Sequence, residues 1–416
     1  MIVKVNKSLF KGEVEASPSK SYAHRLLISA SLKKGETIIY NVGDSEDVIA
    51  TVRCINALGG NVLLKEGNAF VKGITKLNNN VVLDAGESGS TLRFLLPIVV
   101  ALGVKAEFMG KGKLLDRPND ALIKTLNANG GKIEKVKVDG KLNSGVYEID
   151  ASISSQYLTG LLFALPLLNG DSKIVFKSAP VSKSYLDITK EVLTLSDISF
   201  NEEEFSFAIK GNQKYSLPDE VVCEGDFSSA SFMLTCGALG KSVTVKNLNL
   251  NSNQGDKIVI EILRKAGAKI SVNGKDITAK KGELKAFDCN LENAPDLAPI
   301  LSTLAVFCKG ESKLYGVERL RIKESDRLLA IIDNLQKAKI KAEYNGEYLS
   351  IIGGVPKTCE FNGYNDHRIV MASVILAGLI DGGATVTNGN AVSKSYTNFY
   401  KDFDRIGGKT NVQMDR

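Results

Sequence analysis

The feature that most constrains the fold of this chain is a pattern of about 70 residues that recurs six times along it. In each copy an apolar, helix-like run ends near a glycine, and a short strand, a turn and an amphipathic helix follow. The six runs are LLISASLKKGETIIYNV, LPIVVALGVKAEFMG, LLFALPLLNGDSKIVFKS, SFMLTCGALGKSVTVKNL, ILSTLAVFCKGESKLYGV and ASVILAGLIDGGATVTNG. They pivot on Gly35, Gly103, Gly170, Gly240, Gly310 and Gly382. We expect each pivot glycine to take the left-handed conformation that closes a helix.

The repeat predicts how the chain divides into domains. A unit of two helices and several strands is too small to bury its apolar helix alone, so the copies must share cores. The third copy lacks a glycine where its second helix ends, at LTLSDISF, and it hands over to the fourth copy near VVCEGDFSS. We therefore expect an α/β (α+β) fold of two similar lobes, each of three βαβαββ-type units with helices buried inside sheet, like an α/β barrel turned inside out. The N-terminal lobe is predicted at residues 20–224, and the C-terminal lobe at residues 225–416 together with the N-terminal strand, residues 1–19.

Composition excludes several classes of function. The net charge of +6 comes from 53 basic and 47 acidic residues spread along the chain, without the basic stripe or tail of a nucleic-acid-binding protein. No apolar run approaches the roughly 18 residues of a membrane span, and no signal peptide is visible, so we expect a cytoplasmic protein. Two histidines and six scattered cysteines disfavour disulfides and a metal site. Because Walker A and Rossmann motifs are also missing, we expect no cofactor.

Polar and positive side chains gather at the predicted starts of helices. The segment SPSKSYAHR, residues 17–25, puts cations and hydroxyls at one helix start, and GESGSTLRF, residues 86–94, is a Gly/Ser loop that opens another. Free N–H groups and the helix dipole make such starts anion sites, and arginines bind phosphate and carboxylate bidentately. Since these starts occur in both predicted lobes, a cleft between the lobes should bind small, strongly anionic ligands. The residues that this pattern singles out are Lys20, Ser21, Arg25, Gly86, Gly89, Arg93, Arg117, Ser154, Ser155, Gln156, Ser182, Lys183, Tyr185, Arg319, Arg321, Lys323, Arg327, His367, Arg368 and Lys394.

Each cluster also has an ordinary structural interpretation. Asn119 (or its neighbour) and Asp296 can each cap a helix, and one serine of SSQYL can do the same. Lys323 and Arg327 are four residues apart, so on a helix they would share one face, with Glu324 or a bound phosphate between them. Asp296 and Glu324 are the only carboxylates among these cations suited to acid–base chemistry. They predict a reaction of proton transfer and electrostatic stabilisation.

Eight segments, in chain order, resemble the EPSP synthase (3-phosphoshikimate 1-carboxyvinyltransferase) family: SPSKSYAHR, ESGSTLR, DRP, SSQYL, EGDFSSASF, RIKESDR, NDHRIVMA and SKSYTNF. The resemblance covers essentially the whole chain. It implies a fold of two lobes with three repeats each. It also implies transfer of the enolpyruvyl group of phosphoenolpyruvate to the 5-hydroxyl of shikimate 3-phosphate, with release of phosphate, on the route to chorismate and the aromatic amino acids.

The resemblance further implies a role for each site residue. Asp296 is expected to take the proton of the 5-hydroxyl, and Glu324, with Lys20, to handle the proton at the methylene carbon. Gly89 suggests sensitivity to glyphosate, whereas Glu87 and Arg319 depart from the residues usual in the family. The residues implied for shikimate 3-phosphate are Lys20, Ser21, Arg25, Ser154, Ser155, Gln156, Ser182, Asp296 and Lys323. Those implied for phosphoenolpyruvate are Lys20, Gly89, Arg117, Gln156, Arg327, Arg368 and Lys394.

Three alternatives stay open from the sequence. The sister enolpyruvyltransferase that acts on UDP-N-acetylglucosamine is similar in fold but usually carries a cysteine in the loop equivalent to residues 110–117, where KGKLLDRP has none. A nucleic-acid-binding protein would need interleaved aromatics and a continuous basic face. A catalytically inactive relative would bind the same ligands without turnover. The expected partners are therefore the two small-molecule substrates, bound by a monomer, with no nucleic acid and no membrane.

Overall fold

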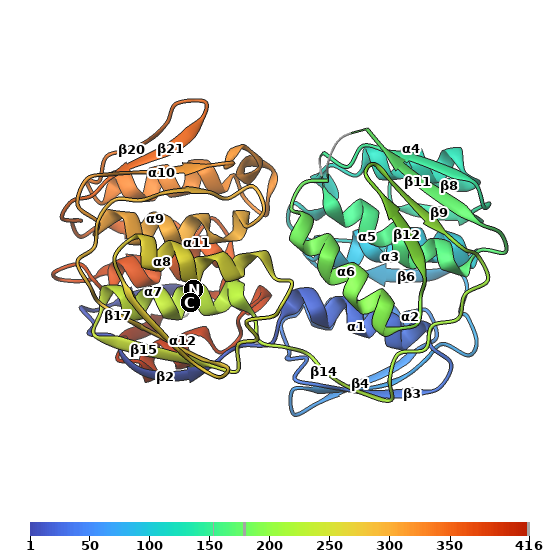
Figure 1. The fold of residues 1–416 in the computed structure, drawn as a ribbon, viewed down its shortest axis with the longest axis horizontal. Coiled ribbons are helices and arrows are strands. Elements are labelled where there is room, and N and C mark those ends of the chain that lie inside the picture. Colours follow the sequence, from blue (N-terminus) through green and yellow to red (C-terminus); the bar gives the residue numbers. More distant parts are fainter. Residues whose placement is uncertain (153, 178–179, 414–416) are drawn as a thin grey trace. The chain divides into compact units, whose positions relative to one another are not determined.

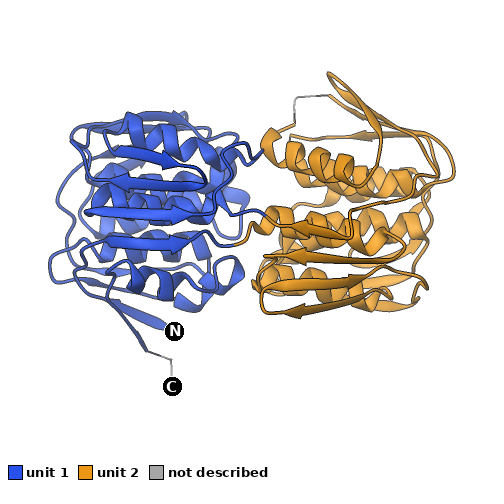
Figure 2. Cartoon of the chain, turned by 60° about the horizontal axis from the view of Figure 1, so that its bottom comes forward, with its two compact units in different colours: residues 1–17, 224–416 blue, residues 18–223 orange. Residues whose placement is uncertain are grey.

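The computed structural model describes residues 1–152, 154–177 and 180–413. Contacts divide the chain into unit 1, residues 1–17 with 224–416, and unit 2, residues 18–223 (Figure 2). The chain therefore passes from one unit to the other twice, at residues 17/18 and 223/224. These boundaries lie within two residues of those expected from the repeat, at 19/20 and 224/225.

The strands form six four-stranded sheets with one common topology. In every sheet the first two strands are parallel and the other two join antiparallel. In unit 2 the sheets are β14(Glu220–Val222)-β3(Glu36–Tyr40)-β5(Asn68–Lys72)-β4(Asn61–Lys65), β6(Val81–Asp84)-β7(Ala106–Met109)-β9(Lys137–Gly140)-β8(Gly131–Glu134) and β10(Val146–Ile149)-β11(Ser172–Phe176)-β13(Ser206–Ile209)-β12(Phe200–Glu203).

Unit 1 repeats this order and uses the N-terminal strands to complete two of its sheets. Strand β2 pairs parallel with β15, placing Val14 opposite Val245, and β1 lies between β23 and β24. The sheets are β2(Lys11–Glu15)-β15(Ser242–Lys246)-β17(Asp276–Lys280)-β16(Lys269–Asn273), β18(Asp288–Asn290)-β19(Glu311–Tyr315)-β21(Tyr348–Ile352)-β20(Ala342–Tyr344) and β22(Glu360–Phe361)-β23(Ala384–Val386)-β1(Ile2–Val5)-β24(Thr410–Gln413).

Each repeat contributes one deeply buried helix and one helix at the periphery (Figure 1). Every residue of α7, α9 and α11 is buried, so these helices have no polar face and can be stable only inside a core. The helices are α1(Lys20–Leu32), α2(Glu46–Ala57), α3(Gly89–Leu102), α4(Asp120–Ala128), α5(Ser155–Ala164), α6(Lys183–Leu195), α7(Phe227–Leu239), α8(Val259–Lys265), α9(Ala298–Val306), α10(Arg327–Lys337), α11(His367–Ala377) and α12(Phe399–Arg405). Short 3-10 turns are η1(Leu114–Asp116), η2(Leu165–Leu167), η3(Gly255–Ile258), η4(Pro295–Leu297), η5(Glu318–Ile322) and η6(Gly389–Lys394). The predicted fold class, with sheet enclosing buried helices in two similar lobes, is confirmed.

The pivot glycines follow the expected conformation only in part. Gly103 ends α3 in the left-handed region, at φ 70° and ψ 29°. The expectation is wrong for Gly240, at φ −98° and ψ −131°, and for Gly170, whose φ is not positive either. A Cβ on Gly240 would lie 2.7 Å from the carbonyl oxygen of Phe10, so close packing rather than backbone conformation requires glycine there. In the third copy, Asp197 takes the left-handed conformation, at φ 57°, where the repeat lacks a glycine.

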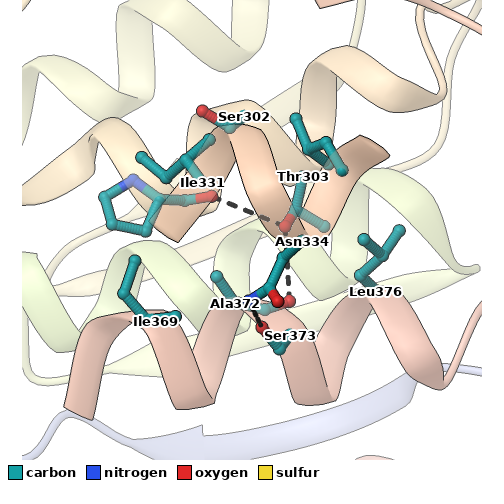
Figure 3. A pocket seen from close by; sticks show the side chains of 10 residues that line it. Ser302, Thr303, Ile331, Asn334, Ile369, Ala372, Ser373 and Leu376 are labelled. Atoms are coloured by element: carbon teal, nitrogen blue, oxygen red, sulfur yellow. Dashed lines mark hydrogen bonds between the residues drawn. The ribbon is translucent and has the colours of Figure 1, made fainter. Parts of the chain in front are cut away.

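Packing in unit 1 leaves a small cavity between α9, α10 and α11. Its volume is about 20 Å³, about enough for a single water molecule (Figure 3). The Nδ2 of Asn334 donates to Oγ of Ser373 at 3.2 Å in its wall, and Oγ1 of Thr303 faces the carbonyl oxygen of Ala372. The cavity is lined by Pro299, Ser302, Thr303, Ile331, Asn334, Leu335, Ile369, Ala372, Ser373 and Leu376.

Candidate active site

The start of α1 in unit 2 is held by an ion pair. Lys20 is the first residue of α1, and its Nζ lies 2.7 Å from Oδ2 of Asp47, in the first turn of α2. Both side chains are largely shielded from solvent. Asp47 therefore belongs to the cluster, although the sequence pattern gave no reason to include it. An acidic residue just after a capping serine, here Ser45, is ordinary at a helix start, so its pairing with Lys20 had no local signal.

Gly89 and Arg117, which the sequence predicted as ligands of one substrate, are in contact. A Cβ on Gly89 would lie 2.7 Å from Nη1 and 3.1 Å from Cζ of Arg117. The helix start at α3 is capped by Ser88, which accepts from the backbone N–H of Thr91. Glycine at position 89 thus provides the space in which the guanidinium of Arg117 lies.

The unusual Glu87 of this loop turns toward the segment before Arg117. A Cβ on Gly112 would lie 2.9 Å from Cδ and from Oε2 of Glu87, so the carboxylate lies against the backbone of that glycine. Gly112 has a φ of 56° and is exposed, which makes the close approach possible. The departure from the family pattern is therefore accommodated by the adjacent loop.

Arg93 joins the starts of α3 and α5. Its Nη1 donates to Oε1 of Gln156 at 2.8 Å, and its Nε donates to Oδ1 of Asn119 at 2.9 Å. Nε2 of Gln156 in turn donates to Oγ of Ser90 at 2.9 Å. The expectation that Asn119 caps α4 through its side chain is wrong, because that side chain is committed to Arg93 instead. Arg93 is the cation of the GESGSTLRF segment and was not among the implied substrate ligands, and it fixes the position of Gln156.

The predicted serines lie at two helix starts. Ser154 is the N-cap of α5 and accepts from the backbone N–H of Gln156, so the ordinary interpretation holds for this serine. Ser155 is buried in the first turn. Ser182 precedes α6 in the left-handed region, at φ 53° and ψ 52°, which is uncommon for a residue other than glycine. Such local strain is characteristic of functional sites.

Arg25 lies inside unit 2 rather than at its surface. Its Nε donates to Oγ1 of Thr189 at 2.8 Å, its Nη2 donates to the carbonyl oxygen of Tyr185 at 2.9 Å, and its Nη1 donates to the carbonyl oxygen of Ser21 at 2.7 Å. Its guanidinium also packs over the ring of Phe94, 4.8 Å from the centroid. Burial lowers the pKa of Arg25 to about 9, which still leaves it positively charged near neutral pH. Arg25 thus ties α1 to α6.

In unit 1, Arg327 links three carboxylates from separate repeat segments. Its Nη1 lies 2.7 Å from Oδ1 of Asp296, its Nη2 lies 2.6 Å from Oε2 of Glu324, and its Nε lies 2.7 Å from Oδ2 of Asp366. The side chain of Arg327 is 1% exposed. The predicted acid–base pair, Asp296 and Glu324, is therefore held on one guanidinium.

Asp296 has a second cationic partner. Its Oδ2 lies 3.0 Å from Nη2 of Arg368, the second residue of α11, so the expected role of Asp296 as a simple helix cap is wrong. Burial raises the pKa of Asp296, but the charges of Arg368, Lys323 and Arg327 outweigh it. The net effect is a pKa well below the ordinary value, and Asp296 is ionised at neutral pH.

Lys323 does not share a helix with Arg327, and the prediction that they lie on one helical face is wrong. Lys323 follows η5 in extended conformation, and α10 begins only at Arg327, capped by Asp326. Burial lowers the pKa of Lys323 to about 8, although Asp296 and Glu324 favour its charged form. Arg319, the second departure from the family pattern, also faces Asp296, together with Glu292.

The remaining predicted cation, Lys394, is buried near the end of η6. Its Nζ donates to the carbonyl oxygen of Asn365 at 2.7 Å, just before Asp366 caps α11. Among the described residues, no cluster of histidine, cysteine and acidic side chains could hold a metal ion. The described part of the chain also contains no helix long and apolar enough to span a membrane.

The two clusters have complementary chemistry. In unit 2, cations and hydroxyls lie at the starts of α1, α3, α5 and α6, which suits a phosphate or carboxylate. In unit 1, cations surround two carboxylates that can exchange protons. The cluster of unit 2 is thus suited to binding an anion, and the cluster of unit 1 is suited to proton transfer.

Comparison with known proteins gives a consistent result. The family described as EPSP synthase (3-phosphoshikimate 1-carboxyvinyltransferase) matches residues 5–403. The 3-phosphoshikimate 1-carboxyvinyltransferase of Clostridium novyi (strain NT) is 38% identical over 98% of this chain and 97% of its own length. The protein of the same name from Clostridioides difficile (strain 630) is 36% identical over 98% of both chains.

Solved structures are similar in fold over the full length. EPSP synthase from Acinetobacter baumannii has a TM-score of 0.82 at 23% identity and covers 99% of both chains. The enolpyruvyl transferase NikO from Streptomyces tendae has a TM-score of 0.79 at 13% identity, covering 99% of this chain and 98% of its own. At these identities the likeness concerns the fold alone.

Proposed function

Because this chain belongs to the EPSP synthase family, we infer that its two clusters of helix-start side chains bind the two substrates of that family's reaction. The chain is a transferase that moves the enolpyruvyl group of phosphoenolpyruvate to shikimate 3-phosphate in aromatic amino acid biosynthesis. We propose which side chains bind the two substrates and which side chains transfer the protons.

Both substrates are anions, so each is assigned a set of cationic and polar residues, and the two sets overlap. Shikimate 3-phosphate is assigned Lys20, Ser21, Arg25, Ser154, Ser155, Gln156, Ser182, Asp296 and Lys323. Phosphoenolpyruvate is assigned Lys20, Gly89, Arg117, Gln156, Arg327, Arg368 and Lys394. Arg25 contributes mainly by holding the start of α1 through its bonds to Ser21 and Tyr185. Arg327 and Arg368 carry the positive charge that a carboxylate or phosphate requires, and substrate anions compete with Asp296 and Glu324 for it.

The reaction proceeds by addition and elimination. In the addition, the 5-hydroxyl oxygen bonds to the carbon that carries the phosphate, and the methylene carbon gains a proton and becomes methyl. Asp296, ionised, takes the hydroxyl proton, and Glu324, with Lys20, supplies the proton to the methylene carbon. In the elimination, the methyl group returns its proton to Glu324, the carbon–oxygen bond to phosphate breaks as the leaving phosphate takes the proton held by Asp296, and the enol ether forms. The surrounding cations stabilise the charged tetrahedral intermediate.

The contact of Arg327 with both carboxylates is the observation that carries this mechanism. Replacing Asp296 by Asn keeps the shape but removes the base, so kcat should fall by about 10²–10⁴-fold. Binding of shikimate 3-phosphate, measured by isothermal titration, should weaken much less. A matched variant, Asp333→Asn, changes a carboxylate of the same unit that pairs with Lys337 and Tyr364, and it should keep wild-type turnover. Unchanged turnover in Asp296→Asn would remove this residue from the mechanism.

We further propose that the protein acts as a monomer in the cytoplasm. Each sheet is completed by strands of this same chain, including β1, β2 and β14, so the six-sheet architecture needs no second copy. Sedimentation equilibrium with and without shikimate 3-phosphate tests the monomer. A dimer at micromolar concentration would contradict it.

A further inference from the structure

A further carboxyl of unit 1 lies near Asp296 and has no role in the mechanism above. Asp256 belongs to η3 and is 5% exposed. Within the described residues, its buried Oδ1 makes no hydrogen bond of ordinary length and angle, although the buried Oγ of Ser228, in the first turn of α7, is near enough to favour the charged form. A buried ionised carboxylate is costly in such a setting, because it has lost most of the hydration that stabilises its charge.

The neighbours of Asp256 come from three other segments. Asp226 precedes α7 and caps it, accepting from the N–H of Ser229 at 2.6 Å. Asp296 lies in η4, and Arg368 lies at the start of α11. Burial and the negative charge of Asp296 raise the pKa of Asp256 to about 7, while Arg368 and the hydroxyl of Ser228 oppose the rise and Asp226 adds to it.

The cations near these carboxyl groups stabilise their negative charges unequally. Asp296 is paired with Arg327 at 2.7 Å and with Arg368 at 3.0 Å, and Asp226 is satisfied by the helix start. The cations thus stabilise the negative charge of Asp296 far better than that of Asp256. When two carboxyls interact at short range, one of them takes the proton, and here it is the one without the cations.

We propose that Asp256 is a positioning residue for enolpyruvyl transfer: its buried carboxyl carries a proton, so that Asp296 stays ionised on Arg327 and Arg368 and the site keeps its positive charge for the anionic substrate. This inference rests on the proposed role of Asp296 as the base and of the two arginines as substrate ligands. When Asp256 loses its proton, a second negative charge enters the cluster and repels phosphoenolpyruvate.

The test compares the pH dependence of KM with that of kcat for wild type and Asp256→Asn. The carboxamide reproduces the shape of the protonated carboxyl and cannot ionise. In wild type, KM for phosphoenolpyruvate should rise about tenfold as Asp256 ionises, the size of effect that one added charge has about 12 Å from an anion at an effective dielectric constant of 20. In Asp256→Asn this tenfold contribution should be absent, only the rise caused by Lys323 should remain, and both parameters should match wild type on the acid side.

The matched control is Asp402→Asn, in α12 of the same unit. Burial also raises the pKa of Asp402, but its carboxylate accepts from the hydroxyl of Tyr396 at 2.9 Å and is not among the groups that face Asp256. This variant should keep the wild-type rise in KM. Deprotonation of Lys323 also weakens anion binding as the pH rises, but it does so equally in all three proteins, so the difference between them isolates Asp256.

Two results would overturn the proposal: a wild-type rise in KM retained by Asp256→Asn, or a folded Asp256→Asn inactive at every pH. Should this variant fail to fold, proton uptake by the unsubstituted protein decides the matter. At about pH 8 the phosphates of both ligands are ionised, so uptake on binding phosphoenolpyruvate with shikimate 3-phosphate, measured calorimetrically in buffers of different ionisation enthalpy, must come from protein. An approaching anion favours protonation of Asp256 and also of Lys323, which is about half protonated at this pH and can take up at most about half a proton. The proposal therefore requires uptake of clearly more than half a proton per protein, and smaller uptake rejects it.

The role of Asp296 as the base and the role of Asp256 can be rejected independently of each other. Wild-type turnover in Asp296→Asn would reject the assigned base, whatever Asp256 does. Normal loss of turnover in Asp296→Asn, combined with a wild-type pH profile in Asp256→Asn, would reject the role of Asp256 alone.

Discussion

In the candidate site, the space left by a missing side chain matters as much as the bonds that other side chains make. Gly89 contributes no side chain, yet its missing Cβ is what allows Arg117 to lie against the start of α3. Arg327 satisfies three carboxylates with one side chain, which is possible because a guanidinium presents donors in fixed directions. Lysine in its place would hold one carboxylate well and release the others.

The spatial role of Gly89 leads to a direct prediction. In Gly89→Ala, the new methyl group should displace the guanidinium of Arg117, because the side chain end is more easily moved than the helix. A shift of about 1 Å should raise KM for phosphoenolpyruvate by about ten- to a hundredfold, with a smaller effect on KM for shikimate 3-phosphate. Inhibition by glyphosate should weaken in parallel if it uses the same cation.

Steady-state kinetics on both substrates provides the measurement, with Gly354→Ala as control. Gly354 is exposed, and a Cβ there would meet only the flexible end of Ile340 at 3.3 Å. Equal increases in both KM values would show a general disturbance instead of a displaced Arg117.

The buried helices are tied to one another by polar groups inside an apolar core. His24 of α1 contacts Oγ1 of Thr51 in α2 at 2.7 Å, and Thr51 contacts Oγ1 of Thr91 in α3 at 2.6 Å. Burial first, then the charges of Lys20 and Arg25, lower the pKa of His24 well below its ordinary value, so this histidine is neutral and structural. Such contacts fix the helix starts, and with them the side chains that the starts present.

Unit 1 depends on close packing of α9, α10 and α11 around their small cavity. Replacing Leu376, which lines that cavity, by Ala should enlarge it and lower the free energy of unfolding by about 2–5 kcal/mol. Urea unfolding followed by circular dichroism measures this loss, and turnover should persist below the transition.

The comparison variant is Leu329→Ala, in α10. Leu329 is 55% exposed, so its truncation should change the unfolding free energy by less than about 0.5 kcal/mol. A loss of the same size in both variants would mean that the cavity does not control the stability of this region.

The pairing of the two N-terminal strands determines how the chain is divided into its two units. Strands β1 and β2 lie in sheets of unit 1, although they precede all of unit 2 in sequence. Unit 2 is therefore one continuous segment, residues 18–223, that contains every strand of its three sheets. Unit 1 has two pieces and is complete only when both are present.

This organisation predicts a difference between fragments. Residues 18–223 expressed alone should give a cooperative thermal transition, whereas residues 224–416 alone should not, because two of their sheets lack β1 and β2. Joining residues 1–17 to the start of residues 224–416 through a flexible linker should restore a transition. A cooperative transition in residues 224–416 without that segment would show that the N-terminal strands are dispensable.

The sequence by itself determined the repeat, the identity of the buried helices and the polar character of their starts. These are local properties, because an apolar run without a polar face has to be buried wherever the chain goes, and a charged helix start stays at its end. The same local rules gave wrong predictions at positions that contact residues distant in sequence. Glycine is required at position 240 by the contact with Phe10. The side chain of Asn119 accepts a hydrogen bond from Arg93 instead of capping its helix.

Only the tertiary structure decided which charges meet. The pairing of Lys20 with Asp47, the grouping of Asp296 and Asp366 on Arg327, and the place of Asp256 near Asp296 join segments that are separated in sequence. A one-dimensional pattern carries no distance between such segments. Coulomb energies and desolvation depend on those distances, so acidity and ion pairing are properties of the packed core.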